Sequence, residues 1–114
     1  MTKSTRFITT PIYYVNDQPH IGHVYTTTLC DIYARSMRNL GHNVFFLTGT
    51  DEHGQKIEQH AIEQNLTPQE LADKVSSYFQ DAMDVFNLSN DFFIRTTNPK
   101  HIKQVQKFVK ILEE

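Results

Sequence analysis

The sequence has little of what several protein classes require. Its 114 residues include one cysteine and no tryptophan. A single thiol excludes an intramolecular disulfide framework and is compatible with a reducing compartment. We therefore expect a cytoplasmic protein, with an organellar form left open. There is no apolar run long enough for a membrane-spanning helix, and the first six residues are too short and polar for a signal peptide.

An excess of positive charge is also missing. The formal net charge is −2, so the chain has no general electrostatic attraction for nucleic acid or a membrane surface. What is present is apolar and aromatic: 39% of residues are hydrophobic, including eight Phe and five Tyr. This composition excludes a disordered chain and suits a single packed domain at most.

The N-terminal third predicts a strand, a turn and a helix. Residues 7–15 are rich in β-branched and aromatic side chains, as in a buried strand, and Pro11 predicts a break within it. Residues 16–19 have turn composition. The next segment, 22–40, shows the spacing of a long amphipathic helix. Its apolar positions are Tyr25, Leu29, Ile32, Tyr33, Met37 and Leu40.

A second strand is predicted at residues 44–48, which are almost wholly apolar and therefore typical of a strand buried on both faces. Strand, helix and strand in this order predict a right-handed βαβ unit. The polar residues 49–54 follow this strand. Ligands of open α/β sheets collect at the carboxyl ends of the strands, so we expect both polar clusters to face one crevice.

Two helices, a short strand and a final helix are predicted for the remainder. The first helix covers about residues 55–65, and the next begins with Thr67 as N-cap and Glu70 three residues later. The strand covers 91–96, and the final helix begins near Pro99. The expected core face of the third helix comprises Leu71, Val75, Tyr78, Phe79, Ala82 and Phe86. The fold class is therefore α/β, the first half of a Rossmann-like parallel sheet with flanking helices, incomplete as a domain.

Two histidines, His20 and His23, lie where the first strand leads into the first helix. The start of a helix has unpaired N–H groups and the positive end of the macrodipole, so it attracts anions. Phosphate binding is one interpretation of the pair. Ordinary surface histidines are another, and a zinc site a third, although Cys30 lies two turns away and further ligands are missing. Spacing alone leaves the function open.

Three segments together resemble a known family. They are residues 9–16 (Thr-Thr-Pro-Ile-Tyr-Tyr-Val-Asn), 19–23 (Pro-His-Ile-Gly-His) and 45–54 (Phe-Phe-Leu-Thr-Gly-Thr-Asp-Glu-His-Gly). They are similar to the N-terminus of the methionyl-tRNA synthetases, which are class I aminoacyl-tRNA synthetases, and the resemblance runs from about residue 6 to residue 114. It implies that residues 1–114 are the N-terminal half of the catalytic domain. The Lys-Met-Ser-Lys-Ser half, a connective domain that often carries zinc, and the anticodon-binding domain would lie elsewhere, so we expect a fragment.

The resemblance also implies a reaction and roles for individual residues. The family attaches methionine to its tRNA through methionyl-adenylate, using ATP with Mg²⁺ as substrate. His20 and His23 would be catalytic, gripping the ATP phosphates, with Gly22 leaving room for adenine and Asn16 also on the ATP side. Asp51 would pair with the ammonium group of methionine. The residues expected around methionine are Pro11, Ile12 and Tyr14, with His53 as a neighbour. No metal site is expected within this chain.

Plainer roles and other functions compete with these. Asp51 could cap the following helix, Tyr14 could be ordinary core, and Asn16 could only form a turn. The chain could also be a small nucleotidyltransferase with a His-x-Gly-His motif, or a non-enzymatic nucleotide-binding fragment. As part of a ligase it would meet initiator and elongator methionine tRNA through other domains and no membrane. It would need the remainder of the enzyme to complete the fold. We expect the isolated chain to be inactive and to expose a long apolar edge and face.

Overall fold

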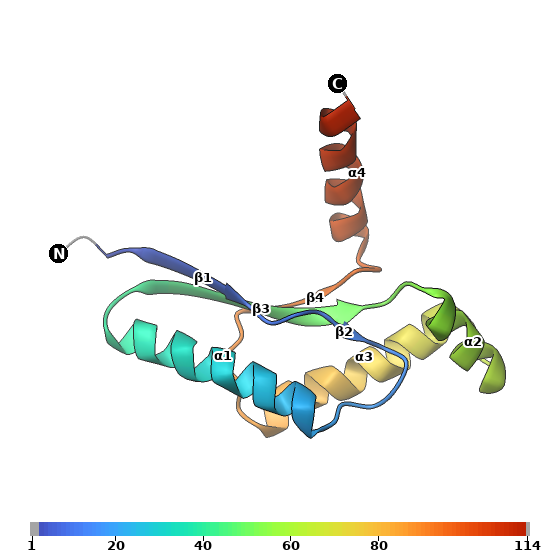
Figure 1. The fold of residues 1–114 in the computed structure, drawn as a ribbon, viewed down its shortest axis with the longest axis horizontal. Helices are drawn as coiled ribbons and strands as arrows, with labels where there is room; N and C mark the ends of the chain where they lie inside the picture. The colour runs from blue at the N-terminus through green and yellow to red at the C-terminus, as the bar shows by residue number, and fades with distance from the viewer. Residues whose placement is uncertain (1–2, 114) are drawn as a thin grey trace.

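The computed structural model describes residues 3–113, which form a parallel sheet with helices (Figure 1). The described elements, in chain order, are β1 (Thr5–Thr9), β2 (Tyr13–Tyr14), α1 (Ile21–Asn39), β3 (Asn43–Asp51), α2 (Gln55–Glu63), α3 (Pro68–Val85), β4 (Phe92–Arg95) and α4 (Pro99–Glu113). The predicted α/β class and the predicted order of elements are confirmed.

Strand β3 is the centre of the sheet, and every pairing it makes is parallel. β1 and β2 pair with successive parts of β3, and β4 pairs with its opposite edge, since Leu47 has both Thr9 and Phe92 as partners. The register changes between β1 and β2. Thr5 pairs with Asn43, an offset of 38, whereas Tyr13 pairs with Thr50, an offset of 37. One extra residue is therefore accommodated between β1 and β2, which confirms the break predicted at Pro11.

The prediction for β3 was wrong in two respects. The strand runs from Asn43 to Asp51, so it includes three residues that we expected to follow it, because β2 and β4 both pair with its second half. It is also not buried on both faces. Phe45 is 43% exposed and stacks on Phe7, which is 64% exposed, with 5.7 Å between the ring centroids. The expected burial of β1 is therefore wrong as well, and the expected exposed apolar face is present.

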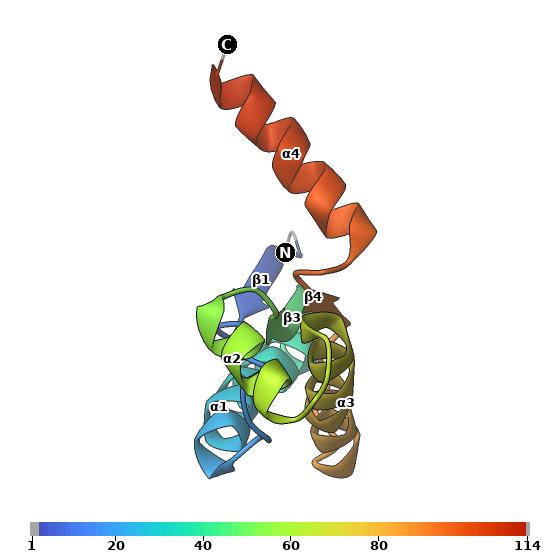
Figure 2. The same ribbon diagram turned by 90° about the vertical axis from the view of Figure 1, so that its right-hand side faces the viewer.

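The helices explain this asymmetry. α1 and α3 lie on the same face of the sheet, whereas α4 extends away from the opposite side (Figures 1 and 2). The main core lies where β2, α2 and α3 meet. Its buried members are Tyr13, Val15, Ile57, Ala61, Leu71, Ala72, Val75 and Phe79.

Helix α1 packs through the opposite side from the one its sequence predicts. Most of its predicted apolar positions are exposed, including Tyr25 at 64% and Ile32 at 57%, while its buried residues are Thr27, Asp31 and Ala34. Asp31 accepts hydrogen bonds from the backbone N–H of Ser89 at 2.7 Å and from Nε of Arg35 at 2.7 Å. Burial raises the pKa of Asp31, but the bonds from Ser89 and Arg35 outweigh it and leave that pKa below its ordinary value. The helix therefore packs against the sheet through a narrow face of small and polar residues, and Asp31 on this face is bonded to the loop at Ser89.

Helices α3 and α4 also differ in burial. α3 buries half of its predicted face, namely Leu71, Val75 and Phe79. Phe86 follows the end of the helix and is 55% exposed, so its predicted place in the core is wrong. α4 has no buried residue within the described range. The radius of gyration is 16.3 Å, larger than the roughly 13 Å of a compact chain of about 100 residues. The open shape reflects the exposed sheet face and the projecting α4.

Candidate functional site

The N-terminus of α1 is capped by its two histidines. His20 is the N-cap residue, and its Nδ1 accepts the backbone N–H of Gly22 at 3.1 Å. In return, Nδ1 of His23 accepts the backbone N–H of His20 at 3.0 Å. The two rings stack with 3.8 Å between their centroids. This is a capping box, in which the side chains of the N-cap residue and of the third helical residue each accept a hydrogen bond from a backbone N–H at the start of the helix. The predicted pairing on one helical face is present.

These hydrogen bonds determine which ring nitrogen carries the proton. A neutral imidazole that accepts at Nδ1 is protonated at Nε2, so each ring keeps one N–H donor for a ligand. Tyr13 and Phe79 make edge contacts with the His23 ring, with centroids 4.7 and 5.0 Å away. This burial, followed by the nearby His20, holds the pKa of His23 below its ordinary value. His23 is therefore a neutral donor near pH 7.

Gly22 has a local structural reason to be glycine. A Cβ at this position would lie 2.9 Å from Cε1 of His20, inside the contact distance. The absence of a side chain lets the His20 ring fold back over the first turn of α1. A role for Gly22 beside adenine stays a prediction.

A hollow of about 320 Å³ opens beside the two imidazoles. Tyr14 is 62% exposed, so its interpretation as ordinary core is wrong, and Ile12 is 41% exposed. The residues that line the hollow are Ile12, Tyr13, Tyr14, Asn16, Asp17, Gln18, His20 and His23. The structure thus brings five of the predicted site residues to one place.

The second predicted cluster lies at the end of β3, beside the first. Asp51 is the last residue of β3 and pairs in register with Tyr14. A hollow of about 290 Å³ has Tyr14, Asn16 and His53 in its lining, and another of about 290 Å³ has Asp51 and His53. Because neighbouring hollows share residues, they form a continuous row along the carboxyl edge of the sheet, where we expected the crevice.

The structure does not support two of the sequence interpretations, Pro11 as a site residue and Asp51 as a helix cap. Pro11 is exposed and lines none of these three hollows, so the structure does not bring it into the group. Asp51 does not cap the following helix: α2 begins at Gln55 with Gly54 as its N-cap and without a side-chain cap bond. The alternative role of Asp51 as a helix cap is therefore wrong.

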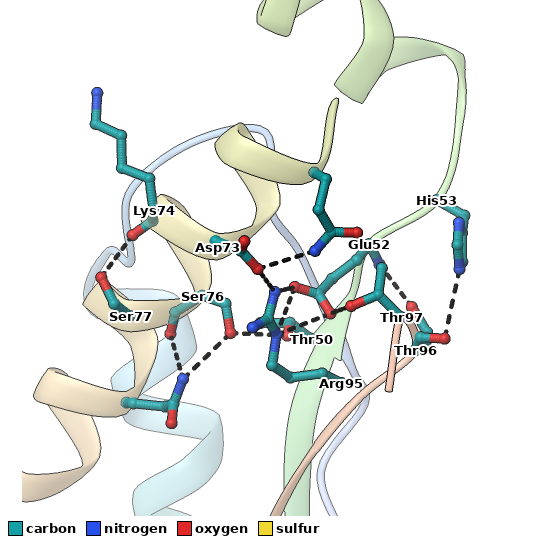
Figure 3. Close-up of polar contacts among 12 residues, drawn as sticks. Thr50, Glu52, His53, Asp73, Lys74, Ser76, Ser77, Arg95, Thr96 and Thr97 are labelled. Atoms are coloured by element: carbon teal, nitrogen blue, oxygen red, sulfur yellow. Dashed lines mark hydrogen bonds and ion pairs between the residues drawn. The ribbon is translucent and has the colours of Figure 1, made fainter. Parts of the chain in front are cut away.

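Sequence reasoning missed a buried ion pair at the same edge. The Glu52 side chain is fully buried, and Arg95, the last residue of β4, makes an ion pair with it at 2.7 Å (Figure 3). The available signal was weak: Glu52 directly follows β3 and Arg95 ends the neighbouring parallel strand β4. Only pairing of β3 with β4 brings them together.

Comparison with known proteins identifies the family. A family model described as "tRNA synthetases class I (M)" matches residues 6–114. The chain belongs to this family. It is similar to the methionine–tRNA ligase of Rickettsia prowazekii, with 58% identity over 96% of this chain and 22% of that protein. The methionine–tRNA ligase of Helicobacter pylori is 56% identical over 94% of this chain and 16% of that protein. The chain thus spans about a fifth of the length of the relatives it matches.

Solved structures of the family agree with the fold. A Mycobacterium tuberculosis methionyl-tRNA synthetase in complex with methionyl-adenylate matches with a TM-score of 0.85 and 42% identity, over 86% of this chain and 19% of that one. A second structure of that enzyme bound by methionyl-adenylate matches with a TM-score of 0.81 and 40% identity, over 88% of this chain and 19% of that one. The parallel sheet and flanking helices described above are therefore those of the family's catalytic domain.

Two features are absent from residues 3–113. Within this range no three His, Cys, Asp or Glu side chains gather as a metal ion would require. None of the helices described there combines the length and apolar character needed to cross a bilayer.

Proposed function

We propose that this chain is the ATP- and methionine-binding N-terminal half of the catalytic domain of a methionine–tRNA ligase. The single observation that carries the proposal is the histidine capping box. It leaves two Nε2–H donors at a helix N-terminus that has no acidic residue in its first turn. Such a terminus attracts phosphate oxygens. It opens onto the same sheet edge as Asp51.

In the proposed reaction, the carboxylate of methionine attacks the α-phosphorus of ATP, and pyrophosphate leaves. The protein has to align the two substrates and stabilise negative charge that builds up on the phosphates. His20 and His23 donate from Nε2 toward that charge, and neither has to lose a proton. Because both rings are held by backbone bonds, their donors are oriented before ATP arrives.

The methionine side of the site is proposed at the end of β3. The Asp51 carboxylate pairs with the ammonium group, a charge-assisted contact, while Ile12 and Tyr14 supply exposed apolar surface for the side chain. Asn16 lies between the two halves, since it lines both of the hollows next to Tyr14. His53 borders this area, and Pro11 supports the chain before Ile12.

Magnesium and tRNA are the remaining proposed partners, and neither is assigned a binding residue in this chain. Magnesium comes with ATP and neutralises its phosphates. Initiator and elongator methionine tRNA are recognised through other parts of the ligase. The chain spans about a fifth of the length of the relatives it matches, so we expect the 114-residue chain alone to show no methionine-dependent pyrophosphate exchange.

The test is His20→Asn in a complete ligase that carries this sequence as its N-terminal segment. Asparagine is a good N-cap, so α1 keeps its first hydrogen bond, but the Nε2 donor is lost. We expect adenylate formation to fall roughly a hundredfold, as when one transition-state donor is removed. Methionine affinity should stay unchanged.

Pyrophosphate exchange and equilibrium binding of methionine measure the two quantities. Thr67→Ala, which removes the cap of α3 instead, is the control and should leave both unchanged once the protein is folded. Equal losses of adenylate formation and methionine affinity in His20→Asn would assign His20 a structural role. A complete ligase without any methionine-dependent exchange would overturn the proposed function.

A further inference from the structure

We propose that Glu52 and Arg95 form a positioning pair that holds Asp51 in place for the ammonium group of methionine. This inference rests on the proposed function and deepens it. Neither residue of the pair touches the substrate in this scheme. Both act through the backbone that carries Asp51.

Hydrogen bonds from Arg95 and Thr97 hold the Glu52 carboxylate. The fully buried Glu52 carboxylate accepts two bonds from Nε of Arg95, at 2.9 and 3.1 Å, and one from Oγ1 of Thr97 at 2.8 Å (Figure 3). A buried carboxylate is stable only when it is paired and its oxygens are hydrogen-bonded. Arg95 and Thr97 meet both requirements, so the position of Glu52 is tightly determined.

The same segment also holds the backbone on either side of Asp51. The Glu52 N–H donates to Oγ1 of Thr96 at 2.8 Å, and the Thr96 N–H donates to the carbonyl of Thr50 at 3.3 Å. His53 Nε2 lies 3.4 Å from the carbonyl oxygen of Thr96. Both sequence neighbours of Asp51 are thus tied to Thr96, and Asp51 itself is in register with Tyr14 on the other edge of β3.

Asp51 and Glu52 serve different sides of the sheet. Asp51 lines the hollow beside α4, whereas Arg95 reaches toward α3 and contacts Asp73 at 2.5 Å. The ion pair therefore lies behind Asp51, away from the surface that would receive methionine.

The charges around Asp51 favour the same role. Arg95 neutralises the carboxylate of Glu52, which would otherwise be a second acid directly beside Asp51. Among the salt bridges of residues 3–113, none involves Asp51. The carboxylate of Asp51 is thus available to pair with an incoming ammonium group at the end of β3.

The experiment uses Glu52→Gln and Arg95→Lys in the complete ligase. Glutamine loses the charge of Glu52, and lysine keeps the charge of Arg95 but loses its two-pronged geometry. For both variants we expect the KM for methionine to rise roughly tenfold, as when a charge-assisted contact is weakened. The KM for ATP should stay within about twofold, because the histidine pair is untouched. Asp73→Asn, which removes only the exposed carboxylate on Arg95, is the matched control and should change neither KM.

Pyrophosphate exchange gives both KM values, and thermal unfolding reports folding. A lower Tm with both KM values unchanged would show a merely structural pair and overturn the inference. Equal rises in the two KM values would overturn it as well. If Glu52→Gln does not fold, Arg95→Lys decides the matter by the same criteria. An unmodified ligase with no methionine-dependent exchange would refute the proposed function itself, whereas unchanged KM values in active variants refute only the positioning role.

Discussion

Helices α1 and α3 begin with the same hydrogen-bonding arrangement built from different side chains. In α3, Oγ1 of Thr67 accepts the Glu70 N–H at 3.2 Å, and the Glu70 carboxylate accepts the Thr67 N–H at 2.8 Å. In α1, His20 and His23 occupy the equivalent positions. Both helices therefore have satisfied first turns, but only α3 places an acid there.

The difference concerns charge. The backbone and side-chain hydrogen bonds from Thr67 lower the pKa of Glu70, so its carboxylate stays ionised and offsets the positive end of the α3 macrodipole. The imidazoles of α1 cap the helix without adding negative charge. One helix start is thus built for its own stability, and the other leaves its positive end available to an anion.

Helices α1 and α3 also differ in the side chains that they bury. α3 presents a conventional apolar face to the core, whereas α1 packs through Thr27, Asp31 and Ala34. Phe79 of α3 links the two regions, because its ring contacts both Tyr13 and His23. The stability of the α3 core therefore supports the geometry of the α1 histidines.

The largest expected effect is that of Phe79→Ala. Phe79 is fully buried, so its truncation should lower the free energy of unfolding by about 3–5 kcal/mol. Phe86→Ala, at the exposed end of the same helix, is the matched control and should cost under about 0.5 kcal/mol. Urea unfolding of the chain measures both. Similar losses at the two positions would contradict the division between buried and exposed apolar side chains.

A smaller effect is expected from removing either cap. Thr67→Ala and His20→Ala should each lower the free energy of unfolding by about 1 kcal/mol, because each leaves a backbone donor of a first turn without its acceptor. His20→Asn should restore most of the loss, since asparagine is a favoured N-cap. Urea unfolding of the three variants and of the unmodified chain measures these free energies. If His20→Asn is as unstable as His20→Ala, the His20 ring does not stabilise α1 through its capping bond.

The smallest effect is a pH dependence between pH 7.5 and pH 5 that, of the two caps, only the α1 cap should show, because the pKa of Glu70 is lowered from an ordinary value of 4.5. His23 has a folded-state pKa below its ordinary value of 6.5, so below about pH 6.5 the unfolded state binds a proton that the folded state resists. The contribution of His23 to stability is complete above that pH and is lost as the pH falls through the folded-state pKa.

His23→Gln tests this dependence. Glutamine can still accept the His20 N–H as the third residue of a capping box, but it does not titrate. Thermal unfolding from pH 7.5 to pH 5, run beside the unmodified chain, should show a shallower fall in Tm for the variant. Identical slopes would exclude His23 as the titrating group.

Much of the site was predictable because its signals are local. Pro11 predicted the interruption between β1 and β2, and Thr67 and Glu70 predicted the start of α3. The His-Ile-Gly-His segment predicted a strand-to-helix junction with two histidines on one face, and its neighbouring motifs identified the family. The roles of all the predicted site residues toward substrates stay predictions: Pro11, Ile12, Tyr14, Asn16, His20, Gly22, His23, Asp51 and His53.

The sequence by itself determined the elements, their order and the chemistry at their junctions, because spacing, turn composition and capping act over a few residues. Only the tertiary structure decided that α1 buries its polar side, that β3 extends to Asp51, and that Arg95 meets Glu52. These outcomes depend on strand pairing and on which surface each element meets, and Arg95 and Glu52 lie 43 positions apart in the chain. No local pattern encodes the partner across such a separation, so burial and ion pairing were set by the packing of the sheet.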